Sequence, residues 1–276
     1  FDYIVDADDL NTEIKSRILN NGRYYIFLDE IQHVKEFEKA LASFRATLNA
    51  SIFVTGSNST LLSGELTEVS PNFLLTGRTV EFELFPFSFL EMKQYYELNK
   101  MEWNEDKFFD YLKWGGFPLR FDYKNETAVR RYLSNLYESI VNRDIIGKSQ
   151  SADKKRFMDI SLYLLANAGK EMSVDNLVAA YKDDGREVSR RSIYNYIERM
   201  KKAYLIHGAG RYNITGKTSL SNREKLYAVD MGFRTINTNT MNYEDTFFLE
   251  NTIQASPGFI VSSDVFSLSK TNGANL

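Results

Sequence analysis

Short apolar, β-prone runs alternate with amphipathic helical segments over residues 1–92, and this order constrains the fold more than any other feature of the sequence. Four runs have the length and pattern of strands: residues 1–8 (FDYIVDAD), 24–28 (YYIFL), 51–57 (SIFVTGS) and 79–85 (TVEFELF). The segments between them carry apolar residues at helical spacing. A β-α-β-α order with strongly apolar strands predicts an α/β fold, with a mostly parallel sheet and helices on both of its faces.

The sequence becomes predominantly helical after Ser88. Helical patterns cover residues 89–98, 104–116 and 128–145, and glycines end the second of them. From residue 154 to residue 230 the chain has three further helical segments, in which Ser173 and Ser189 are the predicted caps of the second and third. Two short β-like pieces, GRYNI and KLYAVD, follow. Three helices and a β-hairpin in this order predict a winged helix-turn-helix.

The composition excludes several kinds of site. The 276 residues contain no cysteine, which rules out disulfides, thiolate nucleophiles and cysteine-ligated zinc, and only two histidines. The net charge is −3, so any binding to nucleic acid has to depend on a local basic patch. No apolar run approaches the roughly 18 residues that cross a bilayer. We therefore expect no membrane partner and a cytoplasmic location.

Two adjacent acids, Asp29 and Glu30, end the apolar run YYIFL. An acid at the end of a buried strand can hold a metal-bound water, and a second acid beside it can act as a base on a water that attacks a phosphate. The structural alternative is a solvated strand end whose charges favour the start of the following helix. The motif alone does not separate the two interpretations.

Three polar residues further along the chain favour the chemical interpretation. Ser57 and Asn58 end the next strand-like run, where they could contact a γ-phosphate, and Arg78 precedes the run TVEFELF. An arginine at that place could act as an arginine finger in a neighbouring subunit, which makes a homo-oligomer a candidate assembly. Ordinary turn chemistry for Ser57 and Asn58, and a surface charge for Arg78, are the structural alternatives.

Four stretches of the sequence can be compared with a known family: YYIFLDEIQHV, IFVTGSNSTLL, LLTGRTVEFELFPFSFLE and YLKWGGFPL. Together they resemble a large prokaryotic family of AAA-type P-loop ATPases with a C-terminal domain of unknown function that is thought to be nuclease-like. The resemblance implies ATP and Mg²⁺ as cofactors. It implies that Asp29 organises Mg²⁺ as part of the Walker B motif and that Glu30 polarises the attacking water. It further implies Ser57 or Asn58 as the first sensor and Arg78 as the finger.

The resemblance also implies a domain plan. It consists of an AAA-type ATPase core at 1–92, a helical lid or linker at 93–150, the winged helix-turn-helix at 151–230 and a remnant of the nuclease-like domain at 231–276.

The Walker A pattern G-x-x-x-x-G-K-[ST] does not occur in the 276 residues. The stretch TGKTSL at 215–220 lacks the upstream glycine at the required spacing and falls in the predicted wing. We expect the phosphate loop to lie upstream of Phe1, so ATP hydrolysis is expected of the intact protein and not of these residues alone. The middle of the nuclease-like domain is likewise missing between Ile253 and Pro257, and no nuclease activity is assigned.

The predicted winged helix-turn-helix carries a local excess of basic residues between 182 and 202. Near the start of its third helix, and on its wing, six residues are candidates for DNA contact: Arg190, Arg191, Tyr194, Asn195, Arg211 and Lys217. Winged helices also bind proteins, so a protein partner is the alternative.

Two functions remain open from the sequence. In the first, an AAA-type ATPase binds and hydrolyses ATP and couples its nucleotide state to a DNA-associated winged helix. In the second, a non-hydrolysing DNA- or protein-binding module retains a degenerate ATPase scaffold.

Overall fold

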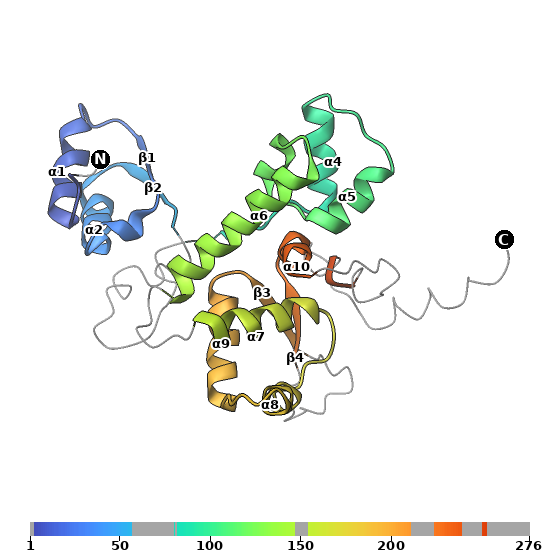
Figure 1. The fold of residues 1–276 in the computed structure, drawn as a ribbon. Helices are drawn as coiled ribbons and strands as arrows, with labels where there is room; N and C mark the ends of the chain where they lie inside the picture. Colours follow the sequence, from blue (N-terminus) through green and yellow to red (C-terminus); the bar gives the residue numbers. More distant parts are fainter. Residues whose placement is uncertain are drawn as a thin grey trace, which may run out of the picture. The chain divides into compact units, whose positions relative to one another are not determined.

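The computed structural model describes residues 3–56, 80, 82–146, 154–210, 224–238 and 250–252. The backbone contacts divide the chain into two compact units, residues 1–83 and residues 84–276. Figure 1 shows the elements of both units along the chain. Each unit is described by itself.

Unit 1 is a small α/β unit. It contains, in chain order, α1 (Ala7–Arg17), β1 (Tyr24–Leu28), the short 3-10 helix η1 (Ile31–His33), α2 (Phe37–Thr47) and β2 (Ala50–Val54). The two strands run parallel, with Tyr24 paired to Ala50 and Leu28 paired to Val54. The predicted parallel arrangement of these two strands around a helical crossover is confirmed.

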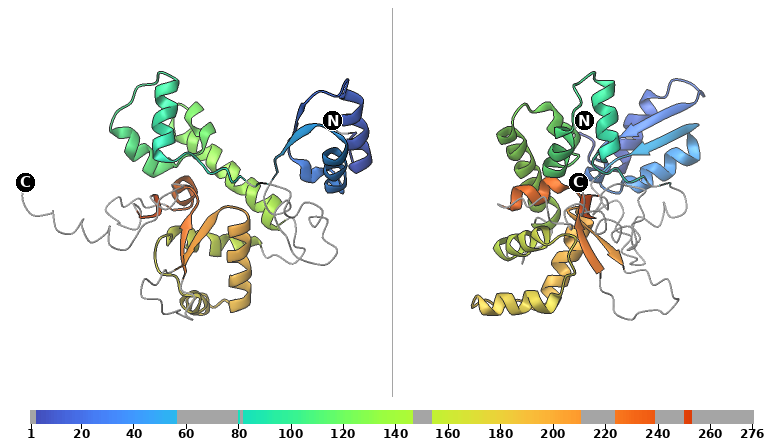
Figure 2. Two further views of the ribbon diagram at one scale, coloured as in Figure 1. Left: turned by 180° about the vertical axis from the view of Figure 1, so that it is seen from behind. Right: turned by 90° about the vertical axis from the view of Figure 1, so that its right-hand side faces the viewer.

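The core of unit 1 lies on one face of this sheet. Helices α1 and α2 lie on the same side of the strands in Figures 1 and 2, and Leu10, Leu41 and Phe44 bury their side chains there. The opposite face exposes Phe27 by 72% and Phe53 by 50%. The prediction of helices on both faces is therefore wrong for the described residues, in which only one face is covered.

Two predicted strands are absent from the described residues. Within residues 3–8, helix α1 begins at Ala7, because Asp6 caps it by accepting bonds from the N–H groups of Asp8 and Asp9. The only strand-like feature there is a single bridge between Asp6 and Lys35. Val80 and residues 82–85 have no strand assignment and no ladder partner in the described part, and a strand without a partner is not stable in water.

Unit 2 begins with helices α4 (Phe89–Leu98), α5 (Asp106–Trp114) and α6 (Glu126–Ile140). The short η3 (Pro118–Asp122) lies between α5 and α6, and the π-helical η4 (Val141–Ile146) continues α6. Ser88 and Glu91 form a capping box at the start of α4. Gly115, at φ 72°, ends α5 as its sequence predicted, because a left-handed residue without a Cβ breaks the helix at no steric cost.

Three more helices and a β-hairpin follow. They are α7 (Lys154–Ala166), α8 (Val174–Asp183), α9 (Arg190–Lys202), β3 (Ile206–Gly210) and β4 (Glu224–Ala228), and α10 (Met231–Asn237) comes after them. Ser173 and Ser189 cap α8 and α9, which confirms both predicted caps. Strands β3 and β4 pair antiparallel. No helix in the described part of the chain combines the length and hydropathy that crossing a bilayer requires.

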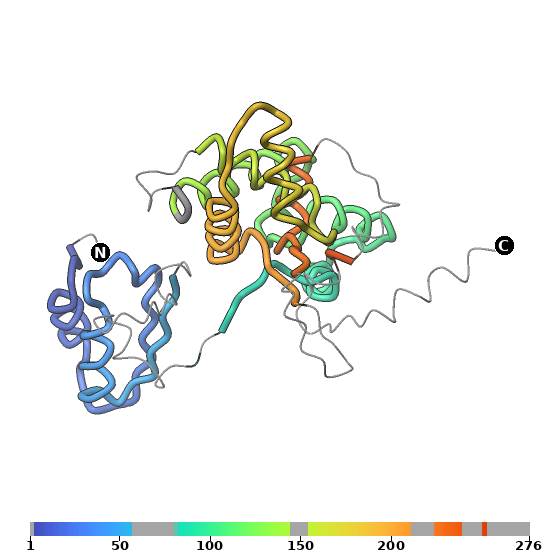
Figure 3. The backbone as a smooth tube through the Cα atoms, turned by 90° about the horizontal axis from the view of Figure 1, so that it is seen from below, coloured from blue at the N-terminus to red at the C-terminus, as the bar shows by residue number. Residues whose placement is uncertain are grey.

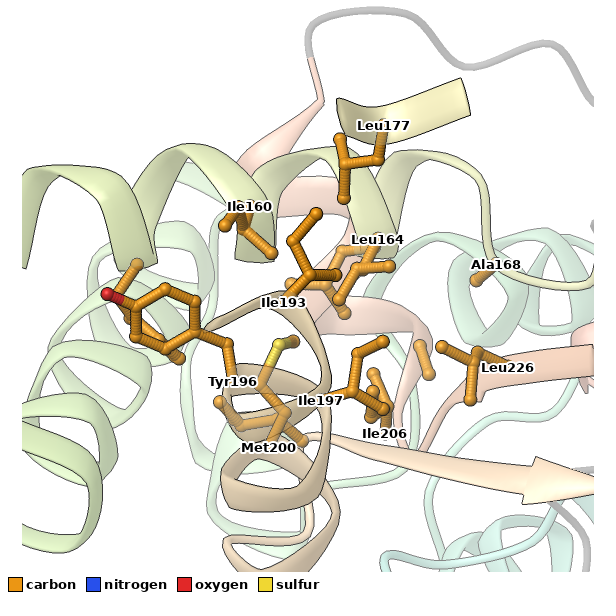
Figure 4. Packing of buried hydrophobic residues seen from close by; sticks show 14 of the residues in the cluster. Ile160, Leu164, Ala168, Leu177, Ile193, Tyr196, Ile197, Met200, Ile206 and Leu226 are labelled. Carbon is orange, nitrogen blue, oxygen red and sulfur yellow. The ribbon is translucent and has the colours of Figure 1, made fainter. Parts of the chain in front are cut away.

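The largest apolar core of unit 2 joins α7, α8, α9, β3, β4 and α10 with the end of α6. Figure 4 shows Ile160 and Leu164 of α7 packed with Ile193 and Ile197 of α9. Helix α10 adds Phe233, which is fully buried and whose ring contacts those of Phe117 and Tyr137 at 4.9 and 5.9 Å. The backbone tube in Figure 3 follows these elements from α4 to α10. The predicted domain boundaries within 93–276 stay predictions.

A buried polar junction fixes the start of α10. One carboxylate oxygen of Asp230 accepts the N–H of Gly116 at 2.7 Å, and the other accepts the N–H of Gly232 at 2.7 Å. Buried Arg120 donates to the carbonyl of Gly115 at 2.6 Å. Burial raises the pKa of Asp230 to about 6, although both backbone bonds act in the opposite direction. The junction thus ties the segment after α5 to the end of the hairpin.

Candidate functional site

The candidate site lies where β1 and β2 end. Asp29 and Glu30 directly follow Leu28, the last residue of β1, and both are exposed. Because the two strands are parallel, their carboxyl ends meet at one edge of the sheet, where α/β proteins bind ligands. The two acids are therefore available to a ligand, with neither of them buried in the helical layer.

Thr55 connects the two strand ends. It is the first residue after β2, and its hydroxyl donates a hydrogen bond to Oδ1 of Asp29. The same hydroxyl accepts the N–H of Glu30 at 3.2 Å. Its backbone N–H donates to the carbonyl of Leu28 at 2.9 Å, and its carbonyl accepts the N–H of Ile31 at 3.1 Å. Sequence reasoning missed Thr55, although its position, the first polar residue after an apolar strand, was the available signal.

Glu30 occupies an uncommon backbone conformation. Its φ of 50° and ψ of 45° are left-handed, so the extended path of β1 ends between Asp29 and Glu30. Its carboxylate accepts a hydrogen bond from the side-chain amide of Gln32, in η1. The two acids are therefore held by different elements, Asp29 by the residue after β2 and Glu30 by η1.

The other predicted residues of this site lie outside the described residues. They are Ser57, Asn58 and Arg78, and the roles given to them stay predictions. After β2 the described part of the chain ends at Gly56, one residue before Ser57.

The two described carboxylates of this site fit Mg²⁺ held together with a nucleotide. Within the described ranges, no three His, Cys, Asp or Glu side chains are grouped as a metal cage would require. Mg²⁺ bound by one or two carboxylates keeps several waters and takes further ligands from substrate phosphates. Exposed Asp29 and Glu30 meet that requirement.

A second candidate surface lies on α9. The side chains of Arg190, Arg191, Tyr194 and Asn195 are all exposed, whereas those of Ile193, Tyr196, Ile197 and Met200 on the other side of the helix are buried. Arg190 pairs with Asp175 of α8, with the guanidinium Nε 2.6 Å from the carboxylate. This exposed pair is screened by solvent and contributes little stability. Arg211 and Lys217 lie outside the described residues.

Glu250 has a packing role in the described structure. Its carboxylate accepts bonds from Lys225 at 2.7 Å and from the hydroxyl of Tyr227 at 2.6 Å. Burial and the nearby Glu250 carboxylate both raise the pKa of Tyr227. Next to it, buried Asn251 bonds the N–H and the carbonyl of Ala228, at 2.8 and 3.1 Å. These bonds attach residues 250–252 to β4.

Two comparisons with known proteins concern the AAA-like part and the fold. A family model described as an AAA domain matches residues 2–93. A solved structure, a Walker-type ATPase of Pyrococcus abyssi, shares the fold with a TM-score of 0.52 and 18% identity, over 84% of this chain and 65% of that one. The chain thus has an α/β fold, with a small parallel sheet and many helices, that is similar to the fold of a Walker-type ATPase.

The family follows from the second half of the chain. A model described as a domain of unknown function (DUF8612) matches residues 105–242, half of the chain, and the chain belongs to this family. An uncharacterised protein of Haemophilus influenzae is 30% identical over 85% of this chain, and an uncharacterised protein of Methanocaldococcus jannaschii is 29% identical over 82% of it. The chain spans 58% and 51% of the length of these two relatives.

Proposed function

We propose that the protein is an AAA-type ATPase that binds and hydrolyses ATP with Mg²⁺, and that unit 1 carries the Walker B half of its site. One observation carries the proposal: two exposed, adjacent acids lie at the carboxyl edge of a parallel sheet, inside the segment that matches the AAA domain. A strand end of this kind has no packing need for two carboxylates. A cytoplasmic location is part of the same proposal.

Each acid has a separate role in this proposal. Mg²⁺ bound with the nucleotide supplies positive charge that neutralises the phosphates. Asp29 orients the waters of that cation by accepting their hydrogen bonds. Glu30 accepts a hydrogen bond from the attacking water and takes up its proton as the general base. Ser57 or Asn58 contacts the terminal phosphate, and Arg78 of one subunit completes the site of another in a homo-oligomer.

The proposal is tested by nucleotide binding in the full-length protein. Wild type should bind a fluorescent ATP analogue more tightly with Mg²⁺ than without it. Asp29→Asn should remove most of this Mg²⁺-dependent gain, because the amide is a poorer partner for the cation's waters. Asp8→Asn, an exposed acid in the first turn of α1, is the matched control and should bind as wild type does. Equal Mg²⁺ dependence in wild type and Asp29→Asn would contradict the role of Asp29.

A second function is favoured by the arrangement of α7, α8, α9, β3 and β4. We propose that this part is a winged helix-turn-helix whose α9 faces DNA, and that the nucleotide state of the ATPase is coupled to it. The exposed residues Arg190, Arg191, Tyr194 and Asn195 on one side of a helix anchored by its other side support this proposal. Arg211 and Lys217 would add backbone contacts. A protein partner in place of DNA, with the ATPase part as a non-hydrolysing scaffold, is the alternative.

The salt dependence of DNA binding separates these two partners. The double variant Arg190→Ala and Arg191→Ala should reduce the slope of log affinity against log salt by up to about 2, since each phosphate contact contributes about 0.9. The double variant Arg130→Ala and Arg131→Ala on α6 removes the same charge and should leave the slope unchanged. Equal slopes in the two double variants would favour a protein partner.

A further inference from the structure

We propose that Thr55 and Gln32 are positioning residues, which hold the carboxylates of Asp29 and Glu30 for the hydrolysis of ATP. This inference rests on the proposed function. It gives a role in catalysis to two side chains that lie outside the Walker B acid pair. Together the four residues form what we call the strand-end clamp.

Thr55 is placed to orient Asp29. Its hydroxyl donates to one carboxylate oxygen of Asp29. No described residue bonds the other oxygen, which can accept bonds from a ligand's waters. The hydroxyl can do this reliably because its own direction is set by the N–H of Glu30, which it accepts at 3.2 Å. One hydroxyl therefore contacts both residues of the acid pair from the neighbouring strand.

Gln32 is placed to orient Glu30. Its amide nitrogen donates to one carboxylate oxygen of Glu30. Its amide oxygen is buried and has no hydrogen-bond partner in the described part of the chain. A buried acceptor without a partner is unfavourable and uncommon in native structures. In this position the Gln32 side chain therefore contributes little to the stability of the fold. Its contribution is the hydrogen bond to Glu30.

The backbone of the turn is held by the same clamp. Glu30 is left-handed, a conformation that L-residues rarely adopt outside turns and functional sites. Thr55 supports it through bonds from its main chain to Leu28, at 2.9 Å, and to Ile31, at 3.1 Å. The side-chain and main-chain bonds of Thr55 thus converge on one turn, and that turn carries both acids.

Because different side chains hold the two carboxylates, Thr55 that of Asp29 and Gln32 that of Glu30, their effects on catalysis can be separated. Loss of the Thr55 hydroxyl should disturb the carboxylate that serves the cation. Loss of the Gln32 amide should disturb the carboxylate that serves the attacking water. A merely structural role would instead lower the thermal stability and change both properties together.

The test uses the full-length protein and four variants. Thr55→Val should raise the Mg²⁺ concentration for half-maximal hydrolysis by about tenfold, the size expected when a supporting partner of a ligand is lost. Gln32→Met should lower kcat by about tenfold with an unchanged nucleotide Kd. Thr55→Ser keeps the hydroxyl and should restore the Mg²⁺ requirement. Thr47→Val is the control, since this hydroxyl bonds the carbonyl of Ser43 within α2, at 2.8 Å, away from both acids.

An independent measurement needs no hydrolysis. Because the Thr55 hydroxyl accepts the N–H of Glu30, Thr55→Val should accelerate hydrogen exchange at that amide, and Thr47→Val should not. One outcome would overturn the clamp and leave the proposed function intact. In it, wild type hydrolyses ATP and Glu30→Gln does not, but Thr55→Val and Gln32→Met both show wild-type kinetics. Absence of hydrolysis in the full-length wild type would overturn both.

Discussion

The two units differ in how far their aromatic side chains are buried. Unit 1 covers one face of a two-stranded sheet and exposes the other, where the rings of Phe27 and Phe53 stack with centroids 4.9 Å apart. Unit 2 also exposes single apolar side chains such as Leu98, but it buries large rings such as Trp114, Phe157 and Phe233 to at most 2% exposure. Unit 2 thus depends on internal packing, whereas unit 1 presents both an apolar sheet face and a polar edge.

This difference separates two kinds of sequence motif. In unit 2 the glycines of WGGFP and the aspartate of VDMG meet in the buried junction around Asp230, so packing explains them without any chemistry. In unit 1 the acids of FLDE are exposed and contribute nothing to the core. A motif that packing does not require is the better candidate for function.

The largest effect is expected at the buried junction. A Cβ added to Gly116 would lie 1.9 Å from the carbonyl oxygen of Phe87, so Gly116→Ala must displace backbone. We expect the free energy of unfolding to fall by about 3–5 kcal/mol, which urea denaturation would measure. Gly210→Ala at the end of β3 meets no atom within 4 Å and should change it by less than about 0.5 kcal/mol. Similar losses of unfolding free energy in the two variants would contradict the close packing inferred around Gly116.

A pH dependence should also distinguish the buried acid from the exposed ones. The pKa of Asp230 is about 6 in the folded protein, against 3.8 for the free group. A carboxyl whose pKa is raised by folding stabilises the fold while protonated. Its contribution is complete below pH 3.8 and is lost as the pH rises through 6.

We expect this loss to reach about 3 kcal/mol. Comparing wild type with Asp230→Asn by urea denaturation at pH 4 and pH 7 isolates the contribution, because the amide does not titrate. A difference between the two proteins that is the same at both pH values would contradict the raised pKa.

The smallest effect is expected on the open face of unit 1. Phe27 is 72% exposed, so Phe27→Ser should lower the free energy of unfolding by about 1 kcal/mol or less, mostly from loss of the stack with Phe53. It should also reduce the fluorescence of a dye that binds apolar surface. Phe44→Ala, which truncates a fully buried ring of the same unit, should cost about 3–5 kcal/mol. Equal losses of unfolding free energy in Phe27→Ser and Phe44→Ala would mean that the face of the sheet with Phe27 is covered in the protein.

Local sequence signals predicted helices α4 to α9 of unit 2 and several of their end residues, but not α10. Ser173 and Ser189 cap helices through their hydroxyls, and Gly115 ends a helix at a positive φ. These signals are local, since capping depends on a few adjacent residues. Strands were harder to predict, because a strand exists only with a partner. Residues 82–85 have the composition of a strand but no partner in the described part of the chain.

The candidate site was predictable only in part. The acids were visible because they end an apolar run. Thr55 acts on them through strand pairing, at a sequence separation of 25 from the Glu30 whose N–H its hydroxyl accepts, and no local pattern records that contact. The parallel register of β1 and β2 was needed to bring it beside the acids.

The central claim is that Glu30 serves the attacking water. Its most direct test is the turnover of ATP by Glu30→Gln in the full-length protein, measured as phosphate release together with nucleotide affinity. Glutamine keeps the size of the side chain and removes the base. We predict unchanged affinity and a rate lower by about 100-fold or more. Phosphate release at the wild-type rate would contradict the account.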